Sequence, residues 1–242
     1  MLRHLWKGLC DLIYPPNCIL CKKYIPQIPP KASLCLPCLN TVEYNKPPFC
    51  RKCSRYLGHS SDQILCNDCQ KTKPQFDQAW GVCLYNGTMR RLIHLFKYGN
   101  RTTLHHTLTK MMFDFINAYQ LDMHRFDLVV PIPLSSTRLR ERGYNQSQLL
   151  AEDIARQFLI EPIYGNLQRI RHTRNQALMG KRERWTNLKG AFRIKYPLLF
   201  SGKSILIVDD LLTTGATVSE AAHALKEAGA KTTEVLTLAI AQ

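Results

Sequence analysis

Two adjacent carboxylates and a loop of hydroxyl residues lie together in residues 202–218, which read GKSILIVDDLLTTGATV. The carboxylates are Asp209 and Asp210, and the loop consists of Thr213, Thr214, Gly215, Ala216 and Thr217. The loop could bind a phosphate, because a glycine lets the backbone close around an anion while hydroxyl and N–H groups donate to it. The two acids would repel a phosphate and therefore suit a neighbouring diol or a metal ion. A ribose with a 5′-phosphate offers both partners.

The flanking segments predict how these residues are positioned. Residues 204–208 form a short, apolar, β-branched run, which is typical of a strand buried on both faces of a parallel sheet. The alanine-rich pattern of residues 218–228 predicts a helix. In open α/β sheets, ligands bind beyond the carboxyl ends of the strands, where the next helix directs its free N–H groups. The sequence therefore predicts an anion site between this strand and this helix.

Each part also has a simpler interpretation. Acid pairs often end strands as solvated residues, and the hydroxyl loop could be an ordinary helix cap. A P-loop is disfavoured because Gly202-Lys203-Ser204 precedes the strand, and the chain has no G-x-G-x-x-G dinucleotide fingerprint. The order of strand, acids, hydroxyl loop and helix favours a binding site. As a whole, residues 205–217 resemble the phosphoribosyl-diphosphate (PRPP) binding motif of type I phosphoribosyltransferases.

A second group of residues with chemical potential is a set of cysteines. Ten occur in the chain, nine of them before residue 70. Eight form C-x-x-C pairs: Cys18/Cys21, Cys35/Cys38, Cys50/Cys53 and Cys66/Cys69. Such a pair brings two thiolates to one tetrahedral metal, and two pairs about a dozen residues apart complete a four-cysteine zinc site. The pattern predicts two structural zinc ions.

The same cysteines leave two alternatives open. Disulfides would need an oxidising compartment, but we see no cleavable signal peptide and no membrane span, so we expect zinc and a cytoplasmic location. The C-x-x-C pairs could combine sequentially, as two ribbons, or alternately, in a cross-braced arrangement, and we favour the ribbons. Cys10 and Cys83 lie outside the pattern and are expected to be ordinary apolar residues.

The chain is strongly basic, with 33 Lys and Arg against 18 Asp and Glu, for a net charge of +15. A zinc ion bound by four thiolates carries about −2, so two such sites would leave about +11. The basic residues concentrate in residues 138–142 and 169–195. This charge indicates an anionic partner without choosing among nucleic acid, a membrane surface and a phosphorylated metabolite.

Between the cysteines and the terminal motif, the pattern predicts a linker, two strands and three helices. The linker is expected at residues 71–74, the strands at 79–85 and 126–132, and the helices at 89–96, 104–119 and 147–158. Asn145 is a candidate N-cap for the last helix. In a type I phosphoribosyltransferase fold, the diphosphate of PRPP would lie on the loop after the strand at 126–132. The candidate ligands there are Ser135, Ser136, Arg138 and Arg142, together with Lys97.

Several short motifs extend the resemblance along the chain. They are FKY at 96–98, VPIPL at 130–134, RGYNQ at 142–146 and NLKGAF at 187–192. With the PRPP motif and the cysteines, they resemble the ComF/GntX family of phosphoribosyltransferase-like proteins. The resemblance implies an α/β fold with a mostly parallel five-stranded sheet between helices, behind a zinc-ribbon region. We expect an amphipathic helix at 1–14, a double zinc ribbon at 15–74 and a phosphoribosyltransferase domain at 77–242.

The first functional hypothesis is a Mg²⁺-dependent phosphoribosyltransferase. The 5′-phosphate of PRPP would bind residues 213–217, and Asp209 and Asp210 would bind the ribose as the catalytic pair. The diphosphate, with Mg²⁺, would lie near Ser135, Ser136 and Lys97, and a nitrogen nucleophile would displace it.

The second hypothesis is a single-stranded-DNA-binding accessory protein that works with DNA-uptake proteins, since competence proteins belong to the family. The phosphoribosyltransferase fold would then be a regulatory or vestigial module. Basic residues of 169–195 would contact phosphates, with Tyr164, Trp185 and Phe192 available for stacking. The ribbons could also serve only to fold and dock the N-terminal region.

Overall fold

The computed structural model describes residues 17–25, 33–58, 63–171 and 181–242. The helix expected at 1–14 lies outside these residues, as do residues 172–180 of the basic stretch 169–195. The helices are α2 (Leu36–Leu39), α3 (Asn67–Thr72), α4 (Gly87–Tyr98), α5 (Leu104–Ala118), α6 (Ser136–Arg142), α7 (Gln146–Phe158), α8 (Lys181–Leu188), η2 (Pro197–Phe200) and α9 (Ala216–Glu227). The strands are β1 (Gln78–Leu84), β2 (Leu128–Pro131), β3 (Glu161–Pro162), β4 (Leu167–Arg169), β5 (Phe192–Ile194), β6 (Ser204–Leu212) and β7 (Thr232–Ile240).

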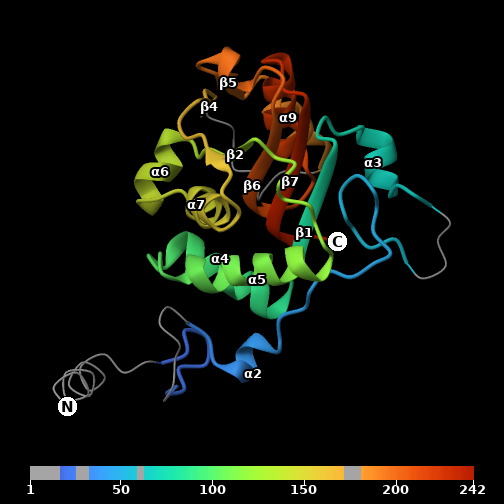
Figure 1. Cartoon of the computed structure of the whole chain (residues 1–242). Coiled ribbons are helices and arrows are strands. Elements are labelled where there is room, and N and C mark those ends of the chain that lie inside the picture. Colours follow the sequence, from blue (N-terminus) through green and yellow to red (C-terminus); the bar gives the residue numbers. More distant parts are fainter. Residues whose placement is uncertain (1–16, 26–32, 59–62, 172–180) are drawn as a thin grey trace.

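The centre of the molecule is a five-stranded sheet in the order β1-β7-β6-β2-β3, and neighbouring strands in it are parallel (Figure 1). Helices α4, α5 and α7 cover one face and α9 covers the other. A separate antiparallel pair, β4 and β5, stands over the end of the sheet near α9. The predicted α/β fold with a five-stranded, mostly parallel sheet is confirmed.

Strand β6 runs through the middle of this arrangement. Leu206 and Val208 pack against the α4, α5 and α7 face, whereas Ile205 and Ile207 pack against the α9 face, and all four are buried. Successive side chains of a strand point to opposite faces, so an unbroken apolar run suits a strand that is covered on both sides. Burial of each such side chain contributes about 1.5–3 kcal/mol.

Strand β6 is longer than the sequence indicates, because it continues through both acids to Leu212. Its pairing with β2 stops at Val208, opposite Pro131, while its pairing with β7 continues to Leu212. Beyond Val208 the edge that faced β2 is therefore open. The acids are strand residues beside this opening, where Asp210 is buried and Asp209 is partly buried, and the apolar run ends where the β2 partner ends.

The segment between the two cysteine groups adds to the edge of the sheet. Residues 43–45 run antiparallel to β1. The backbone N–H of Asn45 donates to the carbonyl of Val82 at 2.9 Å, and the N–H of Leu84 donates to the carbonyl of Glu43 at 2.8 Å. The edge strand β1 is thus partly covered by the chain itself.

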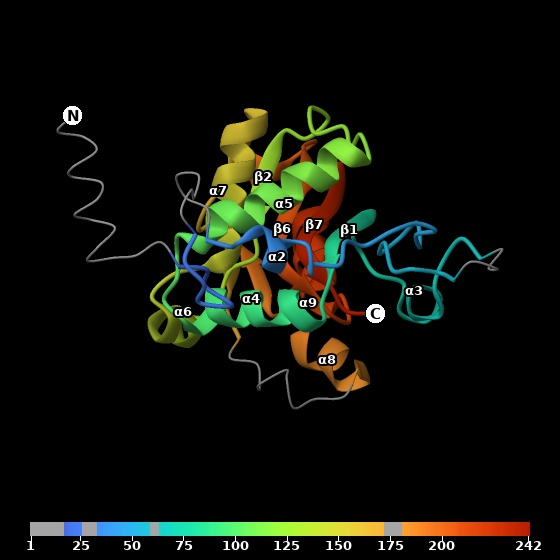
Figure 2. The same ribbon diagram turned by 90° about the horizontal axis from the view of Figure 1, so that it is seen from below.

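The two cysteine regions dock at different places. The first, with α2, lies against α4 and α5, and the second, with α3, lies beside β1 (Figures 1 and 2). In the second region the predicted linker at 71–74 is partly wrong, because α3 continues to Thr72 and ends at Lys73 in the left-handed conformation. The last C-x-x-C pair starts a helical turn that extends past its final cysteine.

Candidate functional site

The acid pair lies at the carboxyl end of β6 and faces α4 and α7. Asp210 is buried, and its Oδ1 lies 2.8 Å from Nζ of Lys97 at the end of α4. Oδ1 of Asp209 accepts hydrogen bonds from Oγ of Ser147 at 2.8 Å and from the backbone N–H of Asp210 at 2.9 Å. Lys97 was a sequence-predicted site residue, whereas Ser147 was predicted only as part of a helix. The two helices bring a cation and a hydroxyl to the acids.

The pKa of Asp209 is raised from its ordinary value of 3.8 to about 7. Burial is the main cause, and the charge of Asp210 adds to it, while Lys97 and the Ser147 hydrogen bond act in the opposite direction. Near neutral pH this carboxyl is therefore poised between its two protonation states.

We expect Asp209→Asn to stabilise the protein, because it removes this partly buried acid, whose charged form is poorly solvated, and keeps an oxygen for Ser147. Between pH 3.8 and 7 the folded chain holds a proton that the unfolded chain has released, so wild-type stability falls as the pH rises. The variant lacks this loss. Its midpoint of urea unfolding should exceed that of wild type, by more at pH 8 than at pH 5.5, with a gain of at least about 1 kcal/mol at pH 8.

Asp127 provides the matched control. Its pKa is lowered, mainly by the backbone N–H of Ser204 and further by Lys203, so its ionised form favours the folded state. Asp127→Asn should lower stability, and by a similar amount at pH 5.5 and pH 8, since both values lie above its titration. A stability gain for Asp209→Asn that did not grow with pH would contradict the environment assigned to Asp209.

The hydroxyl loop joins β6 to α9 as the sequence predicted. Gly215 has φ +82°, in the left-handed region that glycine tolerates, and it is the N-cap of α9. Oγ1 of Thr214 accepts from the N–H of Ala216 at 3.4 Å. The loop therefore ends at the start of a 12-residue helix, whose first N–H groups and dipole favour an anion. The loop residues Thr213 to Thr217 begin three positions after Asp210, directly beyond the end of β6.

The second loop at this end of the sheet follows β2. Ser135 is the N-cap of α6, and its Oγ accepts from the N–H of Arg138 at 3.4 Å. A hydroxyl that accepts still has its own hydrogen to donate, so Ser135 keeps one donor for a ligand. Asn145 caps α7 through the N–H of Ser147, as predicted, and its Nδ2 also donates to the carbonyl of Ile132. Asn145 thereby ties this loop to the helix that carries Ser147.

Arg142 is placed next to the Lys97 end of α4. Its guanidinium donates to Gln146 at 3.0 Å and to the hydroxyl of Tyr98 at 3.3 Å, and it lies 5.1 Å from the centre of the Tyr98 ring. These contacts fix the Arg142 side chain between α4 and α7. Ser136, by contrast, is exposed at the start of α6.

Besides Ser147, sequence reasoning missed Arg169 on β4 as a residue of this site. Its pKa is lowered to about 10, mainly by burial and further by the charge of Arg138, while Asp209 acts in the opposite direction. Two guanidiniums and a carboxylate thus interact at the opening beside β6. Arg169 also lies over the ring of Phe192 on β5, 5.9 Å from its centre. The basic stretch in the sequence gave no sign that its first member turns inward.

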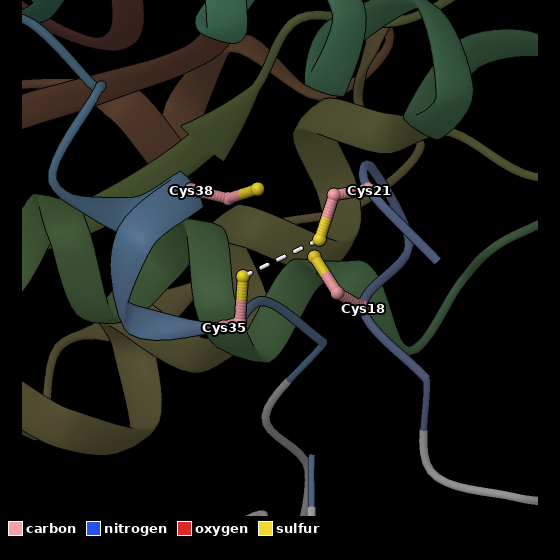
Figure 3. Close-up of side chains that lie close together, drawn as sticks. All are labelled: Cys18, Cys21, Cys35 and Cys38. Atoms are coloured by element: carbon pink, nitrogen blue, oxygen red, sulfur yellow. Dashed lines mark hydrogen bonds between the residues drawn. The ribbon is translucent and has the colours of Figure 1, made fainter. Parts of the chain in front are cut away.

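The cysteines form two clusters, and the sequential grouping is confirmed. In each cluster, the four Sγ atoms lie within 4.8 Å of one another. The Sγ atoms of Cys21 and Cys35 are 3.6 Å apart (Figure 3), as are those of Cys53 and Cys66. Tetrahedral zinc with Zn–S bonds of about 2.3 Å places sulfurs about 3.8 Å apart, so both sets fit zinc.

One cysteine of each cluster is favoured as a thiolate, whereas the pKa values of its neighbours Cys38, Cys53 and Cys69 are raised. Although burial acts to raise it, the pKa of Cys18 is lowered to about 6, because backbone N–H groups around Cys21 and Cys35 donate to its sulfur. In the second cluster, hydrogen bonds from the thiols of Cys53 and Cys69 lower the pKa of Cys50. N–H groups directed at cysteine sulfur suit a bound zinc ion. The clusters therefore support structural zinc.

Fold and site together define a phosphoribosyltransferase domain joined to a double zinc ribbon. Comparison with protein-family models gives the same two parts: the double zinc ribbon domain matches residues 9–70, and the phosphoribosyl transferase domain matches residues 145–241.

The chain is also similar to curated proteins along most of its length. DNA utilization protein YhgH of Escherichia coli (strain K12) is 30% identical, with 93% of this chain and 96% of that protein covered. Competence protein F of Haemophilus influenzae is 28% identical, with 85% and 96% covered, and competence protein ComFC of Bacillus subtilis (strain 168) is 29% identical, with 88% and 89% covered. The chain belongs to the ComF/GntX family.

The expectation of no membrane span can be compared with the length and hydropathy of the helices. Within the described residues, none of the helices has both the length and the apolar character needed to cross a bilayer.

Proposed function

We propose that the protein binds PRPP with Mg²⁺ and transfers its phosphoribosyl group to a nitrogen acceptor. The observation that carries this proposal is the acid pair, held by Lys97 and Ser147 and followed by the Gly215 loop at the start of α9. Carboxylates accept hydrogen bonds from a ribose diol, and the loop offers N–H and hydroxyl donors to a 5′-phosphate. The acid pair, which would bind the ribose, is followed directly by the loop that would bind its 5′-phosphate.

The diphosphate would lie on the other loop of the opening, between β2 and α6. Arg138 and Arg169 repel each other in this arrangement, since the charge of Arg138 lowers the pKa of Arg169. An anion between them would relieve the repulsion. Ser135 and Ser136 add hydroxyl donors, and Lys97 and Arg142 add positive charge from the α4 side. Charge stabilisation of a leaving diphosphate needs such donors.

In the proposed reaction, the acceptor nitrogen forms a bond to C1 of the ribose as the bond from C1 to the diphosphate oxygen breaks. The diphosphate leaves with the electron pair, and the nitrogen loses its proton to water. Bound Mg²⁺ would neutralise charge on the diphosphate, and carboxylate oxygens such as those of Asp209 and Asp210 are the ligand type it prefers. The contribution of the protein is to orient PRPP and to stabilise charge.

Calorimetric titration of the zinc-loaded protein with PRPP, with and without Mg²⁺, tests this proposal. Ribose 5-phosphate and Mg²⁺ pyrophosphate, titrated separately, report on the two halves of the site. We expect PRPP to bind more tightly than either part. An absence of heat with all three ligands would exclude a working PRPP site. Binding would justify a screen of amines and bases for release of diphosphate.

We propose single-stranded DNA binding in DNA uptake as a second candidate function. It is supported by the names of the relatives, which refer to competence and DNA utilization, and by the +15 charge. Of the aromatic residues considered for stacking, Phe192 is buried under Arg169 and is excluded, whereas Tyr164 is exposed and Trp185 is partly exposed. We place either function in the cytoplasm, where reduced thiolates can hold zinc.

Fluorescence anisotropy with a labelled oligonucleotide distinguishes this second function. Affinity that falls steeply with added salt, and falls further in Arg182→Ala/Arg184→Ala, would support it. No binding at low salt would dismiss it. The two candidate functions are compatible, because the acid pair and the segment with Arg182 are separate parts of the chain.

A further inference from the structure

One buried arginine connects the second cysteine cluster to the phosphate loop. Arg55 follows Cys53 by two residues, and only 9% of it is exposed. Its guanidinium donates to the backbone carbonyl of Thr213 and, at 3.0 Å, to the carbonyl of Ala241. It also pairs with the carboxylate of Asp68 at 2.8 Å. A single side chain thus joins the ribbon, the hydroxyl loop and the end of β7.

The contact with the Thr213 carbonyl affects the direction in which the next backbone N–H group of the loop points. In a trans peptide, the carbonyl and the following N–H point in opposite directions. While Arg55 holds the Thr213 carbonyl on the ribbon side, the N–H of Thr214 points away from the ribbon. The same contact turns a carbonyl oxygen, which would repel an anion, away from the loop interior. Arg55 therefore acts on the orientation of this peptide from outside the loop.

Both members of the ion pair depend on the four-cysteine cluster for their position. The backbone carbonyl of Arg55 accepts from the N–H of Cys50 at 2.8 Å, and Asp68 lies on α3 between Cys66 and Cys69. Short cysteine segments lack a core of their own and take up their fold with the metal. Zinc at the second cluster would thus fix both Arg55 and the carboxylate that orients it.

The segment that directly follows the second ribbon also contacts the loop and its helix. The N–H of Gln75 donates to Oγ of Ser219 on α9 at 2.9 Å, and the ring of Phe76 lies under Gly215. The first ribbon packs on α4 and α5 instead, with Leu20 and Val42 in that core. The first ribbon therefore contacts α4 and α5, whereas the second contacts the loop that follows β6.

We propose that Arg55 is a positioning residue through which the second zinc ribbon sets the 5′-phosphate loop for binding. This inference rests on the proposed function, because it assumes that the ligand of the loop is a phosphate. It adds a role for the ribbon, whose folding would complete the loop's geometry, and it makes phosphate affinity depend on the second metal site.

The test compares Arg55→Met and Arg55→Lys with wild type, all in the full-length, zinc-loaded protein. Arg51→Met, which removes an exposed arginine of the same ribbon, is the matched control. We expect Arg55→Met to weaken ribose 5-phosphate and PRPP by about tenfold each, which corresponds to one lost hydrogen bond to a charged group. Mg²⁺ pyrophosphate should bind as in wild type, because its site is the loop after β2. Arg55→Lys should recover part of the loss.

A general loss of structure would weaken all three ligands and would not be rescued by lysine, and that result would overturn the proposal. So would unchanged affinity for ribose 5-phosphate in Arg55→Met. The zinc content of every variant is measured, and it should remain two ions per chain.

Amide hydrogen exchange gives a readout that needs no ligand. In Arg55→Met, exchange of the amides of residues 213–217 should become faster, while that of β2 and α7 stays as in wild type. Unchanged exchange in this loop would refute the coupling. If wild type bound none of the ligands, the proposed function would fail, yet the exchange data would still decide whether Arg55 holds the loop.

Discussion

The variant Asp209→Asn/Asp210→Asn is expected to lose PRPP binding, with affinity reduced at least about 100-fold. Each carboxylate would accept a charge-assisted hydrogen bond from the ribose diol or bind Mg²⁺, and such contacts contribute about 1.5–3 kcal/mol each. Asparagine keeps the shape and one acceptor oxygen, so Ser147 retains a partner. Calorimetry with Mg²⁺ PRPP measures the loss.

Asp122→Asn/Glu227→Gln is the matched control, since it removes two exposed acids and changes the net charge by the same amount. It should leave PRPP affinity within about twofold of wild type, apart from a small general attraction for anions. Unchanged affinity in the Asp209/Asp210 variant, with normal zinc content and circular dichroism, would show that the ribose site lies elsewhere.

The second large effect is expected for Lys97→Met, which leaves Asp210 buried beside Asp209 without its cation. The side chains of Lys97 and Asp210 are 18% and 8% exposed, and their charged atoms are 2.8 Å apart. Removal of one member of a buried ion pair costs about 3–5 kcal/mol, because the other charge stays unpaired. We expect the urea midpoint at pH 8 to fall by a corresponding amount.

Two further variants give this prediction its specificity. Lys97→Met/Asp210→Asn removes both charges and should recover most of the lost stability. Lys110→Met breaks a surface pair with Asp114, whose side chains are 72% and 51% exposed, and it should change stability by less than about 0.5 kcal/mol. If Asp210→Asn did not rescue Lys97→Met, the loss would have to come from packing around the lysine stem.

Local patterns in the sequence were sufficient for the elements that carry the chemistry. Residues 204–208, the acids and the Gly215 loop follow one another within a single strand, turn and helix, so the order of residue types determines their arrangement. The cysteine spacing likewise led to both clusters. Asn145 was identified as a cap because an N-cap contact joins residues only two positions apart.

Contacts between distant segments were beyond this kind of inference. Arg55 and Thr213 are separated by 158 positions, and Ser147 and Asp209 by 62. The hydrophobic periodicity of these segments does not predict either contact, because each contact depends on how the ribbon or α7 packs on the sheet. Lys97 was predicted as a ligand for the diphosphate, but its pairing with Asp210 depends on how α4 packs against the sheet. Phe192 was predicted to be available for stacking, whereas the β4–β5 pair buries it.

The antiparallel contact of residues 43–45 with β1 has a consequence for work on fragments. A chain that begins at residue 77 would leave the N–H and C=O groups along that side of β1 without partners. Unprotected strand edges recruit strands of other molecules, which leads to aggregation or to exchange of segments between copies. We therefore expect the N-terminal region to protect β1 from self-association, so the phosphoribosyltransferase domain should be expressed together with it.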